Sequence, residues 1–189
     1  MALEQIRMNN LTVLTKAVSF AAAKHTLQKR KGDAGEPYFN HLAEVASLVA
    51  AATNGEDGNL IAAAYLHDTI EDTDTTYEDL ELAFTTDIAN LVREMTDDKS
   101  LPKEERKRLQ IQNALKHTKR CQILKAADKI SNLRSLAASP PTDWSTDRRS
   151  GYIRWAIEVV EQLKGNNSWL DERFADAVKA AGDTISLRA

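Results

Sequence analysis

A histidine and several carboxylates follow one another at the end of the most apolar run in the sequence. His67 and Asp68 come directly after the stretch Ala62–Leu66, and Glu71 and Asp72 follow within about one helical turn. A neutral imidazole nitrogen and a carboxylate oxygen can bind the same divalent cation, and a buried helix before them would hold both ligands rigidly. A His-Asp dipeptide is common in proteins. It therefore indicates a metal site only if further ligands come from elsewhere in the chain.

Two other segments supply such ligands. His41 lies in the first turn of a predicted helix, and Asp128 interrupts the apolar positions of another. A carboxylate among core positions is costly to bury unless it is paired or binds a metal. Asn132 lies four residues after Asp128 and therefore on the same helix face. The candidate ligands of one divalent cation are His41, His67, Asp68 and Asp128.

The elements that must position these residues are predicted to be helices, because Ala and Leu recur at helical spacing and aromatic residues make up only 6% of the chain. We expect an all-α protein. Its helices are predicted over about residues 11–28, 41–50, 60–66, 77–84, 88–95, from 103 onward, 121–134, 145–163 and from 168 onward. The run 60–66 is apolar on almost every side, as expected for a central buried helix.

Local signals place several helix ends. Thr76 and Asp79 have the spacing of a capping box, and Asn59 and Ser168 are predicted to cap the helices that begin near them. The cations of Lys29–Lys31 run into glycines and a proline, where a helix cannot continue. We expect a basic loop there.

Length and composition favour one globular domain over residues 1–189, without a Pro/Gly/Ser-rich linker. Hydrophobic residues make up 42% and charged residues 28%, which excludes a disordered or fibrous class. The net charge of -3 argues against general nucleic-acid binding, which requires a basic surface.

The single cysteine, Cys121, lies in an apolar run, where core packing is its expected role. It excludes an internal disulfide and suits a reducing compartment. The segment Met1–Arg7 lacks the pattern of a secretory signal, and no run approaches the length of an apolar membrane span. We expect a soluble cytoplasmic protein without a membrane partner. No feature of the sequence sets its oligomeric state.

The order His41, His67–Asp68, Asp128 resembles the HD-domain superfamily of metal-dependent phosphohydrolases, whose helical bundle brings two histidines and two aspartates to one cation. The wider context is more specific. Residues 36–41, 66–73, 96–99 and 127–134 resemble the hydrolase domain of RelA/SpoT-type alarmone enzymes, and the likeness covers roughly residues 10 to 165. It is greatest to the stand-alone small hydrolases similar to the animal-type SpoT homologue. Leu42 stands where that family usually has proline.

This resemblance implies hydrolysis of guanosine 3′-diphosphate 5′-di- or triphosphate (ppGpp or pppGpp) to pyrophosphate and GDP or GTP, usually with Mn²⁺. Two imidazoles and two carboxylates suit Mn²⁺, Fe²⁺ or Zn²⁺ better than calcium, and the choice of Mn²⁺ rests on the resemblance. Glu71 and Asp72 are the predicted catalytic residues, which would orient or deprotonate the attacking water.

An anionic substrate beside an acidic metal site also needs positive counter-charge and nucleoside contacts. The predicted substrate-binding residues are Arg30, Lys31, Lys99 and Arg148 for the phosphates, with Asn132 and Tyr152 for the ribose or guanine.

Two alternatives stay open. The same site could act as a phosphatase of another nucleotide, including NADPH at its 2′-phosphate, because pocket shape selects the phosphate. A non-catalytic nucleotide-binding module is the other alternative, and the complete set of ligand residues counts against it.

Overall fold

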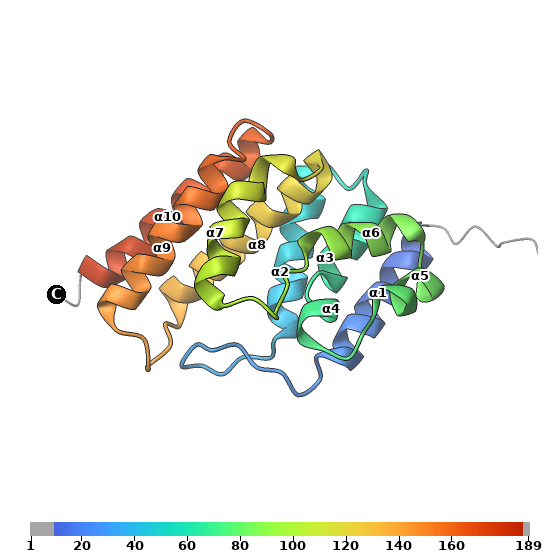
Figure 1. Ribbon diagram of the computed structural model, residues 1–189, viewed down its shortest axis with the longest axis horizontal. Helices are drawn as coiled ribbons and strands as arrows, with labels where there is room; N and C mark the ends of the chain where they lie inside the picture. The colour runs from blue at the N-terminus through green and yellow to red at the C-terminus, as the bar shows by residue number, and fades with distance from the viewer. Residues whose placement is uncertain (1–9, 187–189) are drawn as a thin grey trace, which may run out of the picture.

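The computed structural model describes residues 10–186, and the apolar spacing of the sequence becomes helical throughout this part of the chain (Figure 1). The elements are α1 (Asn10–Lys24), α2 (Phe39–Ala52), α3 (Gly58–Leu66), α4 (Thr69–Asp72), α5 (Tyr77–Ala83), α6 (Thr86–Met95), α7 (Lys103–Asn113), the 3₁₀ turn η1 (Ala114–Lys116), α8 (Lys119–Ala138), α9 (Thr146–Glu161) and α10 (Ser168–Ser186). Between residues 10 and 186 the only β pairing is an isolated bridge from Lys29 to Pro37. The all-α prediction is confirmed.

Helix α3 lies at the centre of the N-terminal half, between α1, α2 and α6. Its residues Leu60, Ala62, Ala63, Ala64 and Leu66 are fully buried. The alanines let the neighbouring helices approach closely, and each buried leucine contributes roughly 1.5–3 kcal/mol of burial free energy. The end of α3 is therefore held in a rigid core.

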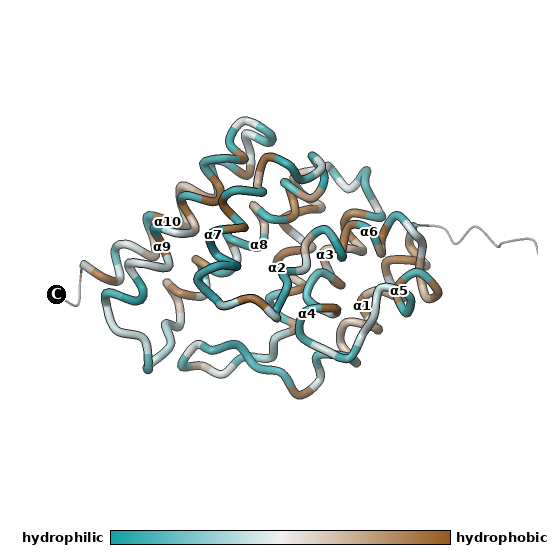
Figure 2. The backbone as a smooth tube through the Cα atoms, in the orientation of Figure 1, coloured by the Kyte–Doolittle hydropathy of each residue, from teal (hydrophilic) through white to brown (hydrophobic). Residues whose placement is uncertain are grey.

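Helix α8 is the longest helix and contacts α10, α2 and α9, so it joins the two halves of the molecule. Its buried positions include Leu124, Ala127, Ile130 and Leu133, as predicted from their spacing. By contrast, α7 has no buried residue and is mostly teal in Figure 2, consistent with its charged sequence. The core thus runs along α8, the helix that carries Asp128.

The capping box at Thr76 and Asp79 is confirmed, because each side chain accepts a hydrogen bond from the other residue's backbone N–H. The cap predicted at Asn59 is wrong. Asp57 accepts from the N–H of Leu60 at 3.0 Å, and Asn59 lies inside α3. Asp57 also receives two hydrogen bonds from Arg120, on α8, which stabilise its carboxylate at that helix end.

The cap predicted at Ser168 is also wrong. Asn167 accepts from the N–H of Leu170 at 3.0 Å, and Ser168 is the first helical residue of α10. Asn167 also donates to the carbonyl of Ala52 at the end of α2, so its position is fixed by a contact between distant segments.

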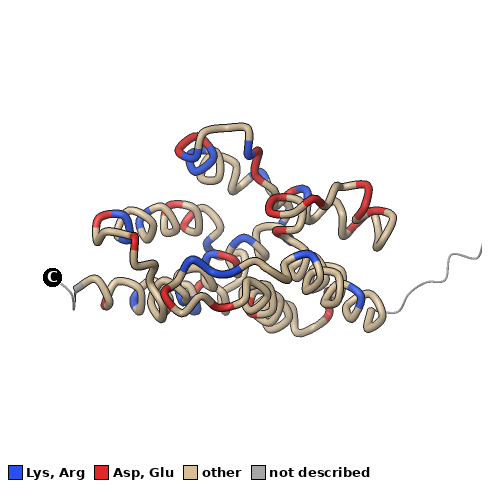
Figure 3. Tube along the Cα trace, turned by 90° about the horizontal axis from the view of Figure 1, so that it is seen from below, with Lys and Arg blue, Asp and Glu red and all other residues tan. Residues whose placement is uncertain are grey.

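The predicted basic loop joins α1 to α2 and faces the viewer in Figure 3. Backbone hydrogen bonds from Arg30 to Glu36 and from Tyr38 to Gln28 close its base. At its tip Gly32 lies against the end of α8, where an added Cβ would be 2.3 Å from the carbonyl oxygen of Ser139. Only glycine allows this approach. The loop is therefore fixed across the end of α8.

None of the helices described is both long and apolar enough to span a bilayer. A cytoplasmic location stays a prediction. The segment Met1–Arg7, in which no leader peptide is predicted, lies outside the described residues.

Candidate metal centre and active-site cavity

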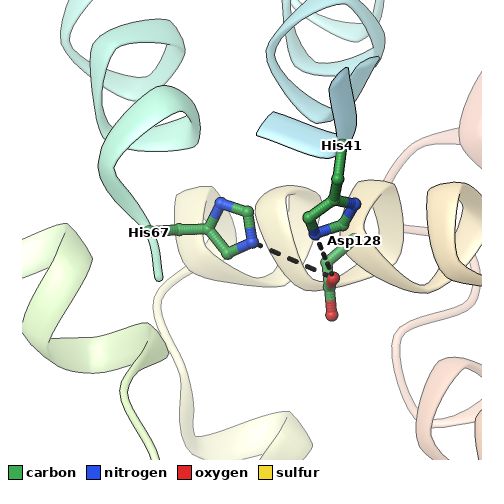
Figure 4. A group of neighbouring side chains, drawn as sticks. All are labelled: His41, His67 and Asp128. Atoms are coloured by element: carbon green, nitrogen blue, oxygen red, sulfur yellow. Dashed lines mark ion pairs between the residues drawn. The ribbon is translucent and has the colours of Figure 1, made fainter. Parts of the chain in front are cut away.

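Three helices bring metal-type side chains to one buried point. His41 comes from the first turn of α2, His67 directly follows α3, and Asp128 lies on α8. Figure 4 shows the two imidazole rings and the carboxylate turned toward one another, and their ligand atoms lie within 4.8 Å of each other. The Nε2 atoms of His41 and His67 are 3.3 Å and 3.9 Å from Oδ1 of Asp128. Asp68 is also close, with Oδ2 3.1 Å from Nε2 of His67 and 3.7 Å from Nε2 of His41.

The Nδ1 atom of each imidazole is hydrogen-bonded on the side away from the cluster. His67 Nδ1 lies 2.8 Å from the carbonyl oxygen of Ala64, so Nδ1 carries the proton. His41 Nδ1 lies 2.9 Å from Oγ of Ser131, whose hydroxyl donates to Glu44 and therefore accepts from the ring. In the neutral form of each ring the Nε2 lone pair would face the centre, and Nε2 of His67 has no hydrogen-bond partner among the described residues. This tautomer is the one a metal ligand needs.

The two carboxylates are oriented by neutral and cationic donors. The hydroxyl of Tyr38 donates to Asp68 at 2.6 Å. Asp128 accepts from Lys129 at 2.9 Å and from the amide of Asn132 at 2.6 Å. Burial disfavours the charged form of both carboxyls, yet the imidazoles, together with Lys129 beside Asp128, hold the pKa of Asp68 and Asp128 below the usual range. Both are anionic at neutral pH.

The pKa values of the two imidazoles are shifted in opposite directions. Burial lowers the pKa of His41, so this ring is neutral. Burial would also lower the pKa of His67, but the carboxylates of Asp68 and Asp128 raise it to about 9. Two buried anions beside one proton leave unbalanced negative charge, which a divalent cation would neutralise. The donor set therefore fits a divalent transition metal.

A cavity of about 420 Å³ opens beside this cluster. Its lining includes seven of the predicted site residues, namely Arg30, Lys31, Glu71, Asp72, Lys99, Asn132 and Tyr152. Arg148 is not among the lining residues. Its guanidinium stacks on the ring of Trp144 at 4.4 Å and lies 3.6 Å from the carboxylate of Asp143.

Glu71 and Asp72 have different environments. Burial, followed by the charges of Asp68 and Asp97, raises the pKa of Glu71 to about 6. Glu71 accepts one backbone hydrogen bond, from Asp97 at 3.3 Å, and lies 3.5 Å from Arg106. Each oxygen of Asp72 is engaged, one by Lys99 at 2.5 Å and the other by Gln28 at 2.8 Å. Glu71 therefore has a raised pKa and few hydrogen-bond donors, as a general base requires.

Several residues of the site carry no role in the sequence-based prediction. Tyr38 and Gln28 position carboxylates, and Lys129 is an almost fully buried cation beside Asp128. Trp144 and Trp155 also had no predicted role, and their ring centroids lie 5.6 Å and 5.3 Å from that of Tyr152. A lysine next to an aspartate inside an apolar helix was a usable signal for Lys129, whereas the orientation of Tyr38 depends on tertiary packing.

A second group of metal-type side chains lies away from the cavity. Glu94, His117 and Cys121 also place ligand atoms within 4.8 Å of one another. Here, however, Glu94 accepts hydrogen bonds from both the N–H and the hydroxyl of Thr118, the residue that caps α8. Burial raises the pKa of the Cys121 thiol to about 12. The group of Glu94, His117 and Cys121 therefore stabilises the start of α8.

Comparison with known proteins identifies relatives of this chain. A family model described as the HD domain matches residues 17–157. Two relatives are named guanosine-3′,5′-bis(diphosphate) 3′-pyrophosphohydrolase MESH1. The Drosophila melanogaster protein is 43% identical over 167 residues, which cover 88% of this chain and 93% of that protein. The Homo sapiens protein is 44% identical over 172 residues, which cover 91% of this chain and 96% of that protein. A solved structure described as a metazoan orthologue of SpoT that hydrolyses ppGpp is 42% identical. It superposes with a TM-score of 0.86 and covers 90% of this chain and 96% of its own.

Proposed function

The chain belongs to the HD-domain family, and from this premise we propose that it hydrolyses ppGpp at the 3′ position, releasing pyrophosphate and leaving GDP. The observation that carries the proposal is a buried cluster of two imidazoles and Asp128, with Asp68 next to it, beside a cavity with both acidic and cationic walls. Such a cavity suits a phosphorylated nucleoside. The similarity to proteins named for this reaction supports the same substrate.

We propose that His41, His67, Asp68 and Asp128 hold one divalent cation, with Mn²⁺ as its identity. When bound, the ion would polarise the phosphoryl group and supply an activated water. Support comes from the chemistry of the donor set and from the unpartnered Nε2 of His67. Ser131 and the carbonyl of Ala64 keep the imidazoles in the ligand tautomer, and Tyr38 and Lys129 keep the carboxylates in place.

Glu71 is proposed as the general base. Its raised pKa lets it accept a proton near neutral pH, and general-base catalysis typically contributes about 10²- to 10⁴-fold in rate. Asp72 is proposed to position Lys99 and Gln28, which it contacts, at the same wall of the cavity. Lys99 would then stabilise negative charge that develops on the phosphoryl oxygens.

The remaining contacts are proposed to bind the nucleotide. Arg30 and Lys31 line the cavity and would offer charge-assisted hydrogen bonds to phosphate oxygens. Arg30 also donates to Asn132 at 3.1 Å, so the two act as one unit beside Asp128. Tyr152 would contact the ribose or base. Arg148 would act from the rim, through Trp144.

Product analysis tests the proposal. The Mn²⁺-loaded protein is incubated with ppGpp or with NADPH, and products are separated by anion-exchange chromatography, with Asp68→Ala as the control. GDP and pyrophosphate from the wild type, and neither from the variant, is the expected result. If NADPH releases phosphate and ppGpp is not cleaved, the proposed metal site is retained and the proposed substrate is wrong. No product from either nucleotide would favour a binding module.

A further inference from the structure

A second cavity, of about 370 Å³, adjoins the active-site cavity. Ser139, Pro141 and Trp144 line both, so the two are neighbouring parts of one depression at the end of α8. The lining of the second cavity is completed by Asp33, Ala34, Ala138, Pro140, Thr142 and Arg149. The tip of the basic loop thus forms a wall of each cavity.

Arg149 is the unusual member of this lining. Its side chain is held in the first turn of α9 with 6% of the residue exposed. Its Nε and Nη1 atoms are buried and have no hydrogen-bond partner among residues 10–186, and Nη2 makes one long contact of 3.4 Å to the hydroxyl of Thr146. A buried guanidinium without acceptors is costly, because both its charge and its N–H groups lose hydration.

No carboxylate in the described part of the chain lies within ion-pair distance of Arg149. The neighbouring Arg148 differs: it is about half exposed, stacks on Trp144 and has Asp143 near it. Consecutive residues of a helix point in directions about 100° apart, so one arginine faces solvent and the other faces the cavity. Arg149 therefore lines the second cavity with a guanidinium whose Nε and Nη1 no described residue satisfies.

We propose that this second cavity binds the terminal phosphate of a nucleoside 5′-triphosphate, so that the enzyme prefers pppGpp to ppGpp. The inference rests on the proposed function and extends it to substrate choice. With the 3′-pyrophosphate at the metal cluster, the 5′ side of the ribose is directed away from that cluster. Ser139, Pro141 and Trp144 line both cavities, so a group that extends from a bound nucleotide along this shared wall would enter the second cavity.

The chemistry of the lining suits a phosphate. A guanidinium offers a planar fork of donors that matches two phosphate oxygens. Ser139 Oγ accepts a hydrogen bond from the N–H of Ala34 at 2.8 Å, which leaves its own hydroxyl proton available to an anion. The hydroxyl of Thr142 is a further donor of the lining. A bound phosphate would neutralise Arg149 and satisfy its free N–H groups.

Steady-state kinetics with both nucleotides provide the first test. The wild type is expected to have a kcat/KM for pppGpp about tenfold above that for ppGpp, the size expected of one charge-assisted contact. Arg149→Gln should bring the two values together by lowering only that for pppGpp. Arg154→Gln, an exposed arginine of the same helix, is the matched control and should keep the wild-type ratio. An equal ratio in the wild type and Arg149→Gln would overturn the proposal.

Calorimetric binding of GTP and GDP separates this inference from the proposed function, because it needs no hydrolysis. Tighter binding of GTP in the wild type, with the difference lost in Arg149→Gln and partly kept in Arg149→Lys, supports the phosphate site even if neither alarmone is cleaved. Equal binding of GTP and GDP by the wild type refutes it.

Thermal unfolding distinguishes a purely structural role. Asp33 is the one carboxylate among the lining residues of the second cavity, and an ion pair with it is the competing explanation. If Asp33→Asn and Arg149→Gln lower the melting temperature equally and leave the GTP-to-GDP binding ratio unchanged, Arg149 is a structural residue and the proposal fails.

Discussion

Two groups of metal-type side chains lie on α8 and its neighbours, and they differ in what their ligand atoms already do. In the cluster of His41, His67 and Asp128, the backs of the imidazoles are hydrogen-bonded and the Nε2 of His67 is left without a partner. In the group of Glu94, His117 and Cys121, each oxygen of the glutamate already accepts a hydrogen bond from Thr118. Proximity of donors is common to both groups. The unpartnered Nε2 of His67 distinguishes the first.

Charge separates the two groups further. Asp68 and Asp128 put two buried anions at the first cluster. Beside Cys121 the amino group of Lys125 is nearly fully buried, and burial lowers its pKa. The group of Glu94, His117 and Cys121 contains one carboxylate, so its demand for a cation is smaller. The first cluster is therefore expected to bind metal and the second to stabilise the fold.

Removal of a ligand should give the largest effect. His67→Ala and Asp128→Ala are expected to abolish tight Mn²⁺ binding and to lower kcat/KM by roughly 10⁴-fold or more, since the chemistry depends on the ion. Cys121→Ala should leave both quantities within about twofold of the wild type, because only packing is changed. Calorimetric titration with Mn²⁺ and steady-state assays measure them. Loss of Mn²⁺ binding in Cys121→Ala would remove the distinction between the two groups.

Glu71→Gln should give the next largest effect. We expect kcat to fall by roughly 10²- to 10³-fold, because the amide cannot accept the proton, while Mn²⁺ affinity stays near the wild-type value. A variant that loses Mn²⁺ together with activity would instead make Glu71 part of the metal centre.

The pH dependence of the activity should follow the ionisation of Glu71. Burial and nearby carboxylates raise the pKa of Glu71 to about 6, so its base form accumulates as the pH rises through that value. Activity is expected to rise over this interval and then level off. A cation at the cluster would lower this pKa, which places the ascending limb at or somewhat below pH 6. The limb should be absent from the residual activity of Glu71→Gln.

As the pH rises, activity should increase, whereas the contribution of Glu71 to the stability of the metal-free protein should decrease. A folded-state pKa of about 6, above the ordinary 4.5, means that folding favours the protonated form of Glu71. Its contribution to the free energy of unfolding is fully present below pH 4.5 and is lost as the pH rises through about 6. Urea unfolding of wild type and Glu71→Gln across this interval should converge at low pH and diverge at high pH.

The smallest effects are expected at the second group. Glu94→Ala removes acceptors from the start of α8 and should cost about 1–2 kcal/mol of stability, measured by urea unfolding, with kcat little changed. Native Cys121 should resist alkylation at pH 8, because its pKa is raised to about 12 and it is fully buried. Rapid alkylation of the folded protein would show an accessible thiolate and contradict this environment.

The features that the sequence predicted correctly are those marked by a polar residue in an apolar helical segment. Asp128 among core positions and His67–Asp68 after an apolar run were recognisable without coordinates, and the helical fold followed from spacing. Helix caps failed where distant segments decide, since Asp57 is held by Arg120 and Asn167 by the end of α2. The burial of Arg149 had no signal in the sequence, because adjacent arginines differ only in the direction in which the helix turns them. The roles of the site residues stay predictions.

The tilted rings of Trp144, Tyr152 and Trp155 lie in contact and place a natural fluorophore beside the cavities. Trp144 lies on the wall shared by the two cavities, and the ammonium of Lys129 lies 4.6 Å from the ring centroid of Trp155. Trp169, on α10, instead packs beside Arg173, away from both cavities. Entry of a nucleotide is therefore expected to alter the emission of Trp144, so that the occupancy of the site could be followed without a label.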